Sequence, residues 1–253
     1  MRETLKIEGL PYGEEHYLGA LPGEESVILE KSEAVSSLAR YIIDKKEPEL
    51  IMGIIKSGYS DCSEEEQAGI MNAVSAIASS GVRANICYNR RRRLIERSLS
   101  DYANSSDKLI LEGFMRFRLE EYKKALKELV YDAADFFFVE EEYNNFIELL
   151  REAVSLTKSR VPMLNVFFDG NIKVCDESLT DVTMDEKMLL DSPDYKMTEE
   201  DKLIGTLIAL CPEKIIIHGR GFLSNETEET IVKVFSPGVI FCSGCENCNN
   251  KRN

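Results

Sequence analysis

The sequence predicts a mixed α+β protein, in which a helical amino-terminal and middle region is followed by a small α/β unit. Two observations support this fold class. Between residues 32 and 154 apolar residues recur every three or four positions, which is typical of helices with one buried face. After Pro162, short β-rich runs alternate with helix-capping signals. We expect residues 1–158 to form the mostly helical region, with short amino-terminal strands, and residues 159–253 to form the α/β unit.

The amino-terminal section predicts two short strands and then helices. The strands are 5–7 and 26–29, and the segment between them is rich in Gly and Pro. A helix begins near Ser32 and is expected to stop at Pro48, because proline has no backbone N–H to donate. Ser63 and Glu66 have the spacing of a capping box, which predicts the start of another helix.

The middle region predicts two long helices. Apolar residues recur at spacings of three and four over 115–136 and again over 139–154. Neither helix is expected to be stable alone, so we expect them to pack together and onto the preceding helices. Phe114, Phe117 and Tyr122 lie at helical spacing, which favours a place in the core over an exposed stacking surface.

The carboxyl-terminal region predicts a hairpin followed by alternating helices and strands. Asp169-Gly170 favours the tight turn of a β-hairpin between strands 164–168 and 171–175. Thr198 and Asn225 each stand three residues before an acidic residue, which predicts two capped helices. We interpret 176–197 as a loop or an insertion. The last strands are expected at 214–218 and 239–242, and the strand–helix–strand order implies parallel pairing with right-handed crossovers.

Three cysteines near the carboxyl end, Cys242, Cys245 and Cys248, follow one another at Cys-x-x-Cys spacing. Such turns can direct two thiolates to one ion, and thiolates are ligands for zinc and for iron–sulfur clusters. The local sequence contains no fourth ligand. Parallel strands would bring His218 and Cys175 to the same carboxyl edge, so both are candidates and His218 is preferred. A mobile tail with free thiols is the alternative that needs no metal.

Net charge and hydropathy limit the compartment and the partners. A formal charge of −14 repels polyanions, which disfavours long contacts with nucleic acid or with an anionic membrane. No apolar segment has the length of a signal peptide or a membrane span, so we expect a cytoplasmic protein without membrane insertion. Thiols stay reduced in that compartment, which favours free or metal-bound cysteines over disulfides.

A basic cluster, Arg90–Arg93 with Arg97, is the sequence feature most compatible with phosphate binding. Because the chain is rich in Asp and Glu, pairing with acidic helices or a solvated face is the favoured interpretation. No serine-hydrolase, zinc-protease or phosphate-loop motif is found, and the two histidines, His16 and His218, leave few options for a triad. The sequence leaves enzymatic activity open and favours a binding role.

Two runs of residues carry a family resemblance. Glu112–Leu119 (EGFMRFRL) with Tyr122 after it, and Glu142–Leu150 (EYNNFIELL), resemble the YtxC-like family. The strand that ends at His218 and the cysteine-bearing end are similar to that family too. The resemblance covers the chain from about residue 90 onward. It implies a cytosolic sporulation protein of endospore-forming Gram-positive bacteria, and it transfers no catalytic or binding residue because the family has no established activity.

The motif residues of this resemblance also have a structural interpretation. Arg116 and Arg118 could pair with Glu120, Glu121 or the acidic run 140–142, which would organise the edge of a helical core.

Together these observations predict a sporulation-associated cytosolic protein that acts by binding an unidentified protein partner. Cys242, Cys245 and Cys248, completed by His218 or Cys175, are a candidate site for a zinc ion or an iron–sulfur cluster, and free thiols without a cofactor are the alternative. Two alternatives remain open. One is a redox, iron–sulfur or zinc-dependent enzyme that uses the same strand edge, and the less favoured one is a nucleic-acid-associated factor that uses Arg90–Arg93.

Overall fold

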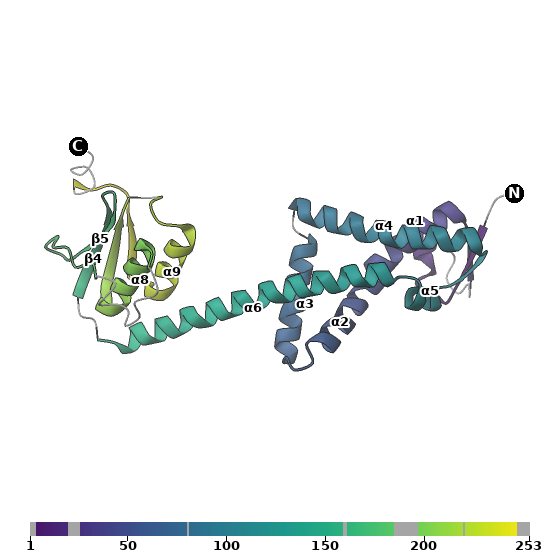
Figure 1. Cartoon of the computed structure of the whole chain (residues 1–253), viewed down its shortest axis with the longest axis horizontal. Helices are drawn as coiled ribbons and strands as arrows, with labels where there is room; N and C mark the ends of the chain where they lie inside the picture. Colours follow the sequence, from purple (N-terminus) through teal and green to yellow (C-terminus); the bar gives the residue numbers. More distant parts are fainter. Residues whose placement is uncertain are drawn as a thin grey trace. The chain divides into compact units, whose positions relative to one another are not determined.

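The protein is described by a computed structural model (Figure 1), which covers residues 4–19, 26–79, 81–158, 161–184, 197–219 and 221–246. The fold is α+β, as predicted. The chain divides into two compact units, Met1–Glu140 and Glu141–Asn253. The division falls inside one long helix, α6 (Glu120–Leu156), so each unit contains part of that helix.

The first unit contains a small three-stranded sheet. Strand β1 (Thr4–Glu8) pairs antiparallel with β2 (Ser26–Glu30) and parallel with β3 (Lys108–Ile110). The first two strands were predicted from the sequence. Strand β3 was not, because its three residues lie directly between two helices and are too few to show an alternating pattern.

Most of the first unit is helical. The predicted capping box begins α3: Ser63 N–H donates to Glu66 Oε2 over 2.6 Å, and Glu66 N–H donates to Ser63 Oγ over 3.2 Å. We expected Pro48 to stop a helix, and this prediction was wrong. It lies in the first turn of α2. Backbone N–H groups there have no partner within the helix, so the missing N–H of proline costs no hydrogen bond. The helical elements are a 3₁₀ turn (Glu15–Leu18), α1 (Lys31–Tyr41), a π-helical turn (Ile42–Lys46), α2 (Glu47–Gly58), α3 (Glu64–Ser79), α4 (Gly81–Ser105), α5 (Leu111–Phe117) and the first part of α6.

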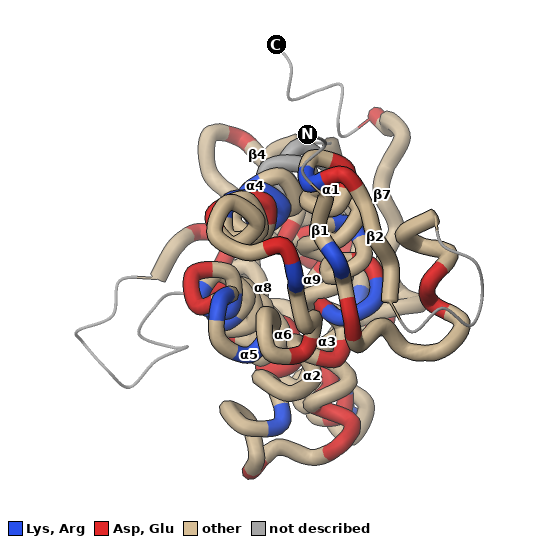
Figure 2. Tube along the Cα trace, turned by 90° about the vertical axis from the view of Figure 1, so that its right-hand side faces the viewer, with Lys and Arg blue, Asp and Glu red and all other residues tan. Residues whose placement is uncertain are grey.

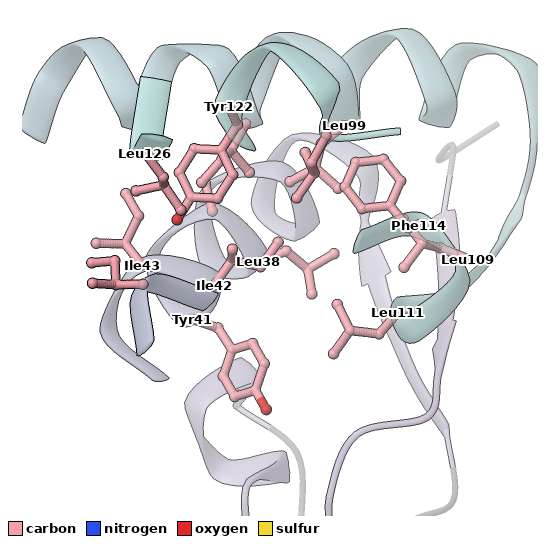
Figure 3. Close-up of a cluster of buried hydrophobic side chains, with 14 of the residues drawn as sticks. Leu38, Tyr41, Ile42, Ile43, Leu99, Leu109, Leu111, Phe114, Tyr122 and Leu126 are labelled. Carbon is pink, nitrogen blue, oxygen red and sulfur yellow. The ribbon is translucent and has the colours of Figure 1, made fainter. Parts of the chain in front are cut away.

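The core of the first unit joins these helices to the sheet (Figure 3). Leu38, Leu99 and Leu126 lie in it at 0% exposure, which anchors α1, α4 and α6 to one another. Phe114 and Tyr122 are buried, as predicted, but Phe117 is 68% exposed. That prediction was wrong because α5 ends at Phe117 and α6 begins at Glu120, so the helical spacing is interrupted between them.

Helix α6 replaces the two helices that the sequence predicted. It runs without interruption over 37 residues from Glu120 to Leu156. The expected boundary near residues 137–138 contains neither Gly nor Pro, so nothing in the local chemistry breaks the backbone hydrogen bonding there. The apolar residues move to another face of α6 along its length, and we mistook this shift for the boundary between two helices.

The second unit contains a four-stranded sheet in the order β5-β4-β6-β7. The predicted hairpin and parallel strands are both present: β5 pairs antiparallel with β4, and β4, β6 and β7 are parallel. The elements are β4 (Val161–Phe168), β5 (Ile172–Cys175), α8 (Glu199–Leu210), β6 (Pro212–His218), α9 (Asn225–Phe235) and β7 (Val239–Cys242).

All the described helices of this unit cover one face of its sheet. The two crossovers proceed in the same direction across the sheet, and right-handed crossovers of that kind place their helices on the same side. Helices α8 and α9 lie together there (Figure 1). Their buried residues and those at the end of α6 pack on Leu164, Val166, Ile215 and Ile217. The neighbouring strand residues, Asn165, Phe167, Ile216 and His218, face the other side by alternation.

Glu200 of α8 stabilises the amino terminus of α9. Its carboxylate accepts hydrogen bonds from Ser224 N–H over 2.7 Å and from Thr227 Oγ1 over 2.6 Å. Ser224 is itself the cap of α9, because its hydroxyl accepts from Thr227 N–H. The predicted cap, Asn225, was therefore placed one residue too late. Burial alone would raise the pKa of Glu200, but the hydrogen bonds from Thr227 and Ser224 lower it overall.

We expect Glu200→Gln to destabilise the second unit by about 1 kcal/mol at pH 7, since it weakens a charged cap that is partly open to solvent. A lowered folded-state pKa stabilises the fold above the ordinary value of 4.5 and stops doing so as pH falls through the folded pKa. Melting temperatures measured at a series of pH values should become equal for the variant and the unmodified protein below the folded-state pKa of Glu200. Glu226→Gln, which removes an exposed carboxylate from the first turn of α9, is the control. A difference in melting temperature between the two proteins that stays the same at every pH would contradict the prediction.

None of the described helices combines the length and the apolar character needed to cross a bilayer.

Candidate metal centre

Three ligand-type side chains meet at the carboxyl edge of the second sheet. Nitrogen or sulfur atoms of His218, Cys242 and Cys245 all lie within 4.8 Å of one another. His218 ends β6 and Cys242 ends β7, and the two residues are direct partners in the parallel pairing. Paired residues of neighbouring strands point to the same face. The sheet therefore brings the first two groups together, and the turn after β7 adds the third.

That turn is Cys242-Ser243-Gly244-Cys245, and its geometry depends on the glycine. Gly244 has a φ of 130°, a conformation that residues with a Cβ rarely adopt. Its N–H donates to Cys242 Sγ over 3.4 Å. Cys245 is directed back toward β6, where its Sγ lies 3.5 Å from His218 Nδ1.

Asn165 of β4 determines which nitrogen of His218 faces the sulfur atoms. Its Nδ2 donates to the Asp176 carbonyl over 3.1 Å, which directs its Oδ1 at His218 Nε2, 3.0 Å away. An amide oxygen only accepts, so Nε2 must carry the hydrogen. In the neutral ring Nδ1 then has the lone pair, and this is the nitrogen that faces Cys245. A histidine that is oriented in this way is typical of metal ligands.

The rest of the pocket holds the ring in place. Phe167 stacks on His218 with ring centroids 4.2 Å apart and planes 11° apart. His218 and Asn165 are buried, whereas Cys242 and Cys245 are half-buried. Asn165 and Phe167 therefore hold the imidazole before any ligand arrives, and the two cysteines stay partly accessible to solvent.

The structure brings together only part of the predicted ligand set. Cys248 lies outside the described residues. Cys175 is not in the group, and its expected position at the carboxyl edge was wrong. Strand β5 runs antiparallel to the others, and Cys175 pairs with Asn165, two residues before the level of His218. Strand β4 also lies between β5 and β6, which separates Cys175 from His218 by a whole strand.

Asn165 was missed by the sequence reasoning, although the sequence contains a signal. It is an isolated amide in the otherwise apolar strand 163–168, and such a residue must have hydrogen-bond partners when it is buried. What the sequence does not reveal is that β4, rather than β5, lies next to β6.

The predicted basic cluster is partly paired with carboxylates. Arg90 lies 3.4 Å from Glu128, Arg91 lies 2.9 Å from Glu47, and Arg92 lies 2.8 Å from Glu96. Pairing of the motif arginines was predicted but is not observed among the described residues. Arg116 lies over the Phe117 ring and Arg118 over the Tyr102 ring instead.

Two thiols and an imidazole at this spacing can bind a single metal ion. Sulfur and nitrogen ligands of tetrahedral zinc lie about 3.5–4 Å apart, so a small closure of the turn would complete the geometry. In a [4Fe–4S] cluster each thiolate binds a different iron, which requires wider spacing, whereas each iron of a [2Fe–2S] cluster takes two protein ligands. The arrangement also has a second chemical capacity, because a thiol beside a histidine that is oriented by an amide can act as a nucleophile.

Comparison with known proteins gives a family and no function. The YtxC-like family matches residues 33–240. The chain is similar to an uncharacterised protein, YtxC, of Bacillus subtilis (strain 168), with 25% identity over 189 residues. The match covers 72% of this chain and 66% of the relative, so it spans just under two thirds of that protein. No solved structure matches the chain.

Proposed function

Because the chain belongs to the YtxC-like family, we propose that it is a cytosolic, sporulation-associated protein that acts by binding, with a carboxyl-terminal unit organised by zinc. The sporulation role and the compartment rest on the family resemblance of the 112–119 and 142–150 runs. The zinc rests on one observation, the convergence of His218, Cys242 and Cys245 within 4.8 Å.

The proposed ligands are His218 Nδ1 and the sulfur atoms of Cys242, Cys245 and Cys248. The first three converge in the structure, and Cys248 follows Cys245 at the same spacing that separates Cys242 from Cys245. Cys175 is the less suitable fourth ligand because it lies on the far side of β4. Three thiolates and one imidazole are a common set for structural zinc.

A zinc ion with four protein ligands has no open position for substrate or water, which favours a structural role over a catalytic one. Such an ion would join the turn after β7 to the end of β6. The two strands are already neighbours, so the metal would stabilise the rim of the sheet and the segment that follows β7. This is why we favour binding over catalysis as the activity of the protein.

The test is a metal analysis and an absorption spectrum of anaerobically purified protein. We expect about one zinc per chain and no visible absorption, since zinc has a filled d shell. Cys248→Ser should lose the metal and Cys175→Ser should retain it. A coloured preparation would instead indicate an iron–sulfur protein. Metal-free protein, or loss of metal on Cys175→Ser alone, would contradict the proposed site.

One observation favours a second candidate, a cysteine-dependent enzyme. Cys245, His218 and Asn165 form a chain of contacts of 3.5 and 3.0 Å in the order thiol, imidazole and amide. The same order activates nucleophilic cysteines in some hydrolases. We rank it second because Cys242 shares the site, and a second thiol is more useful to a metal than to a nucleophile.

Alkylation with iodoacetamide separates the two candidates. A zinc-bound thiolate is protected and should become reactive only after the metal is removed with a chelator. A nucleophilic Cys245 should react rapidly without a chelator, and this reactivity should fall in Asn165→Leu.

A further inference from the structure

Helix α4 is a basic element in an acidic chain. Between Gly81 and Ser105 it has six arginines and two acidic residues, whereas the whole protein has a formal charge of −14. Figure 2 marks the Lys and Arg segments in blue and the Asp and Glu segments in red. A local reversal of charge of this kind is a sign of a surface that interacts with an anionic group.

The arginines of α4 fall into two groups by their partners. Arg90, Arg91 and Arg92 each contact a carboxylate. Arg93 and Arg97 are exposed, and neither has a carboxylate within ion-pair distance among the described residues. They lie four positions apart, so they project from one face of the helix about 6 Å apart along its axis. These two guanidinium groups retain all of their donors for another molecule.

A hollow lies over this face. It is a shallow depression, widely open to solvent, and is lined by Arg90, Arg93, Leu94 and Arg97. A second hollow of about 530 Å³ shares Leu94 and Arg97 with it and reaches Tyr102 and Arg118. Leu94 and the aliphatic parts of the arginines provide an apolar floor, and the guanidinium groups surround it. The surface therefore offers one apolar contact beside two exposed positive charges.

We propose that this arginine face, Arg93, Leu94 and Arg97, binds an acidic segment of a protein partner. Carboxylates pair with guanidinium groups through two parallel hydrogen bonds, which is the strongest form of this contact. In an extended peptide, side chains two residues apart point the same way and lie about 6.6–6.8 Å apart, which matches Arg93 and Arg97. An apolar side chain near these carboxylates would rest on Leu94. The segment is therefore rich in Asp or Glu and contains an apolar residue.

The surroundings favour a peptide over nucleic acid. Asp101, Glu120 and Glu121 line the second hollow, and Glu128 stands beside Arg90. A phosphate backbone brings a negative charge at every nucleotide and would be repelled by these carboxylates. A short peptide can place its acidic residues at the two arginines and nowhere else.

The test is fluorescence anisotropy with a labelled synthetic peptide that contains repeated Glu-Leu-Glu, titrated with the full-length protein at low salt. We expect saturable binding, and Arg93→Gln/Arg97→Gln should raise Kd by about tenfold, because two bidentate charge-assisted pairs are lost together. Arg92→Gln is the matched control: it also removes a charge from α4, but on another face and from a residue paired with Glu96. It should change Kd by about twofold or less.

Three outcomes would overturn the proposal: no saturable binding of the Glu peptide, equal binding of a peptide with Gln in place of Glu, or tighter binding of a single-stranded oligonucleotide. The inference rests on the proposed binding role but not on the metal. Zinc content measured on the same samples therefore distinguishes the failures. Bound zinc without peptide binding rejects only the arginine face, and peptide binding without zinc rejects only the metal centre.

Discussion

Arg91→Met is expected to lower the free energy of unfolding of the amino-terminal unit by about 3–5 kcal/mol. Arg91 and Glu47 are 5% and 6% exposed, and Arg91 Nε donates to Glu47 Oε2 over 2.9 Å. Tyr122 OH donates to the same carboxylate oxygen over 2.7 Å. Removing the guanidinium leaves a carboxylate buried with a neutral donor alone. Burial and the neighbouring Glu47 carboxylate raise the pKa of the Tyr122 phenol, so it stays a neutral hydrogen-bond donor.

The adjacent residue is the control for this prediction. Arg92 pairs with Glu96 one helical turn away, and both side chains are partly exposed. Arg92→Met should therefore cost only about 0.3–0.5 kcal/mol. The double variant Arg91→Met/Glu47→Leu should recover much of the loss, since no unpaired charge remains in the core. Urea unfolding followed by circular dichroism measures all three. Equal losses for Arg91→Met and Arg92→Met would show that the buried pair is not formed.

Local patterns predicted the local structure of this chain well. The Ser63–Glu66 capping box, the Asp169-Gly170 hairpin and the apolar faces of the helices all depend on residues a few positions apart. The predictions were wrong where the structure depends on residues far apart in the sequence, or where the sequence contains no local signal. Strand β3 is defined by its pairing with β1, a hundred residues earlier, and no sequence pattern within β3 indicates that partner.

The candidate site shows the same limit. The sequence predicted that the last strand would deliver its thiols to the edge where His218 emerges, because parallel strands and crossovers determine that edge. It did not predict the order of the sheet. With β4 inserted between β5 and β6, Asn165 rather than Cys175 becomes the neighbour of His218. A hairpin can add either of its strands to the sheet, and only the packing of the whole unit decides between them.

Cys245→Ser is expected to abolish stoichiometric metal binding, because an alcohol is a far weaker zinc ligand than a thiolate at neutral pH. The proposed site would lose one of its four ligands. Cys62→Ser is the matched control. Cys62 is also half-buried, but it lies between α2 and α3 in the other unit. Its replacement should leave the metal content unchanged, and a loss there would contradict the assignment.

Asn165→Leu tests whether His218, Cys242 and Cys245 form a metal site or lie close together by chance. Asn165 has no atom among the proposed ligands, and leucine preserves its size. Its contribution is the hydrogen bond to Nε2, which holds His218 with Nδ1 toward the sulfur atoms. Loss of such an outer contact typically weakens metal binding by about 10- to 100-fold. Competition with a zinc chelator should therefore rank the unmodified protein first, Asn165→Leu second and Cys245→Ser last. Equal affinity of Asn165→Leu and the unmodified protein would mean that His218 does not bind the metal through Nδ1.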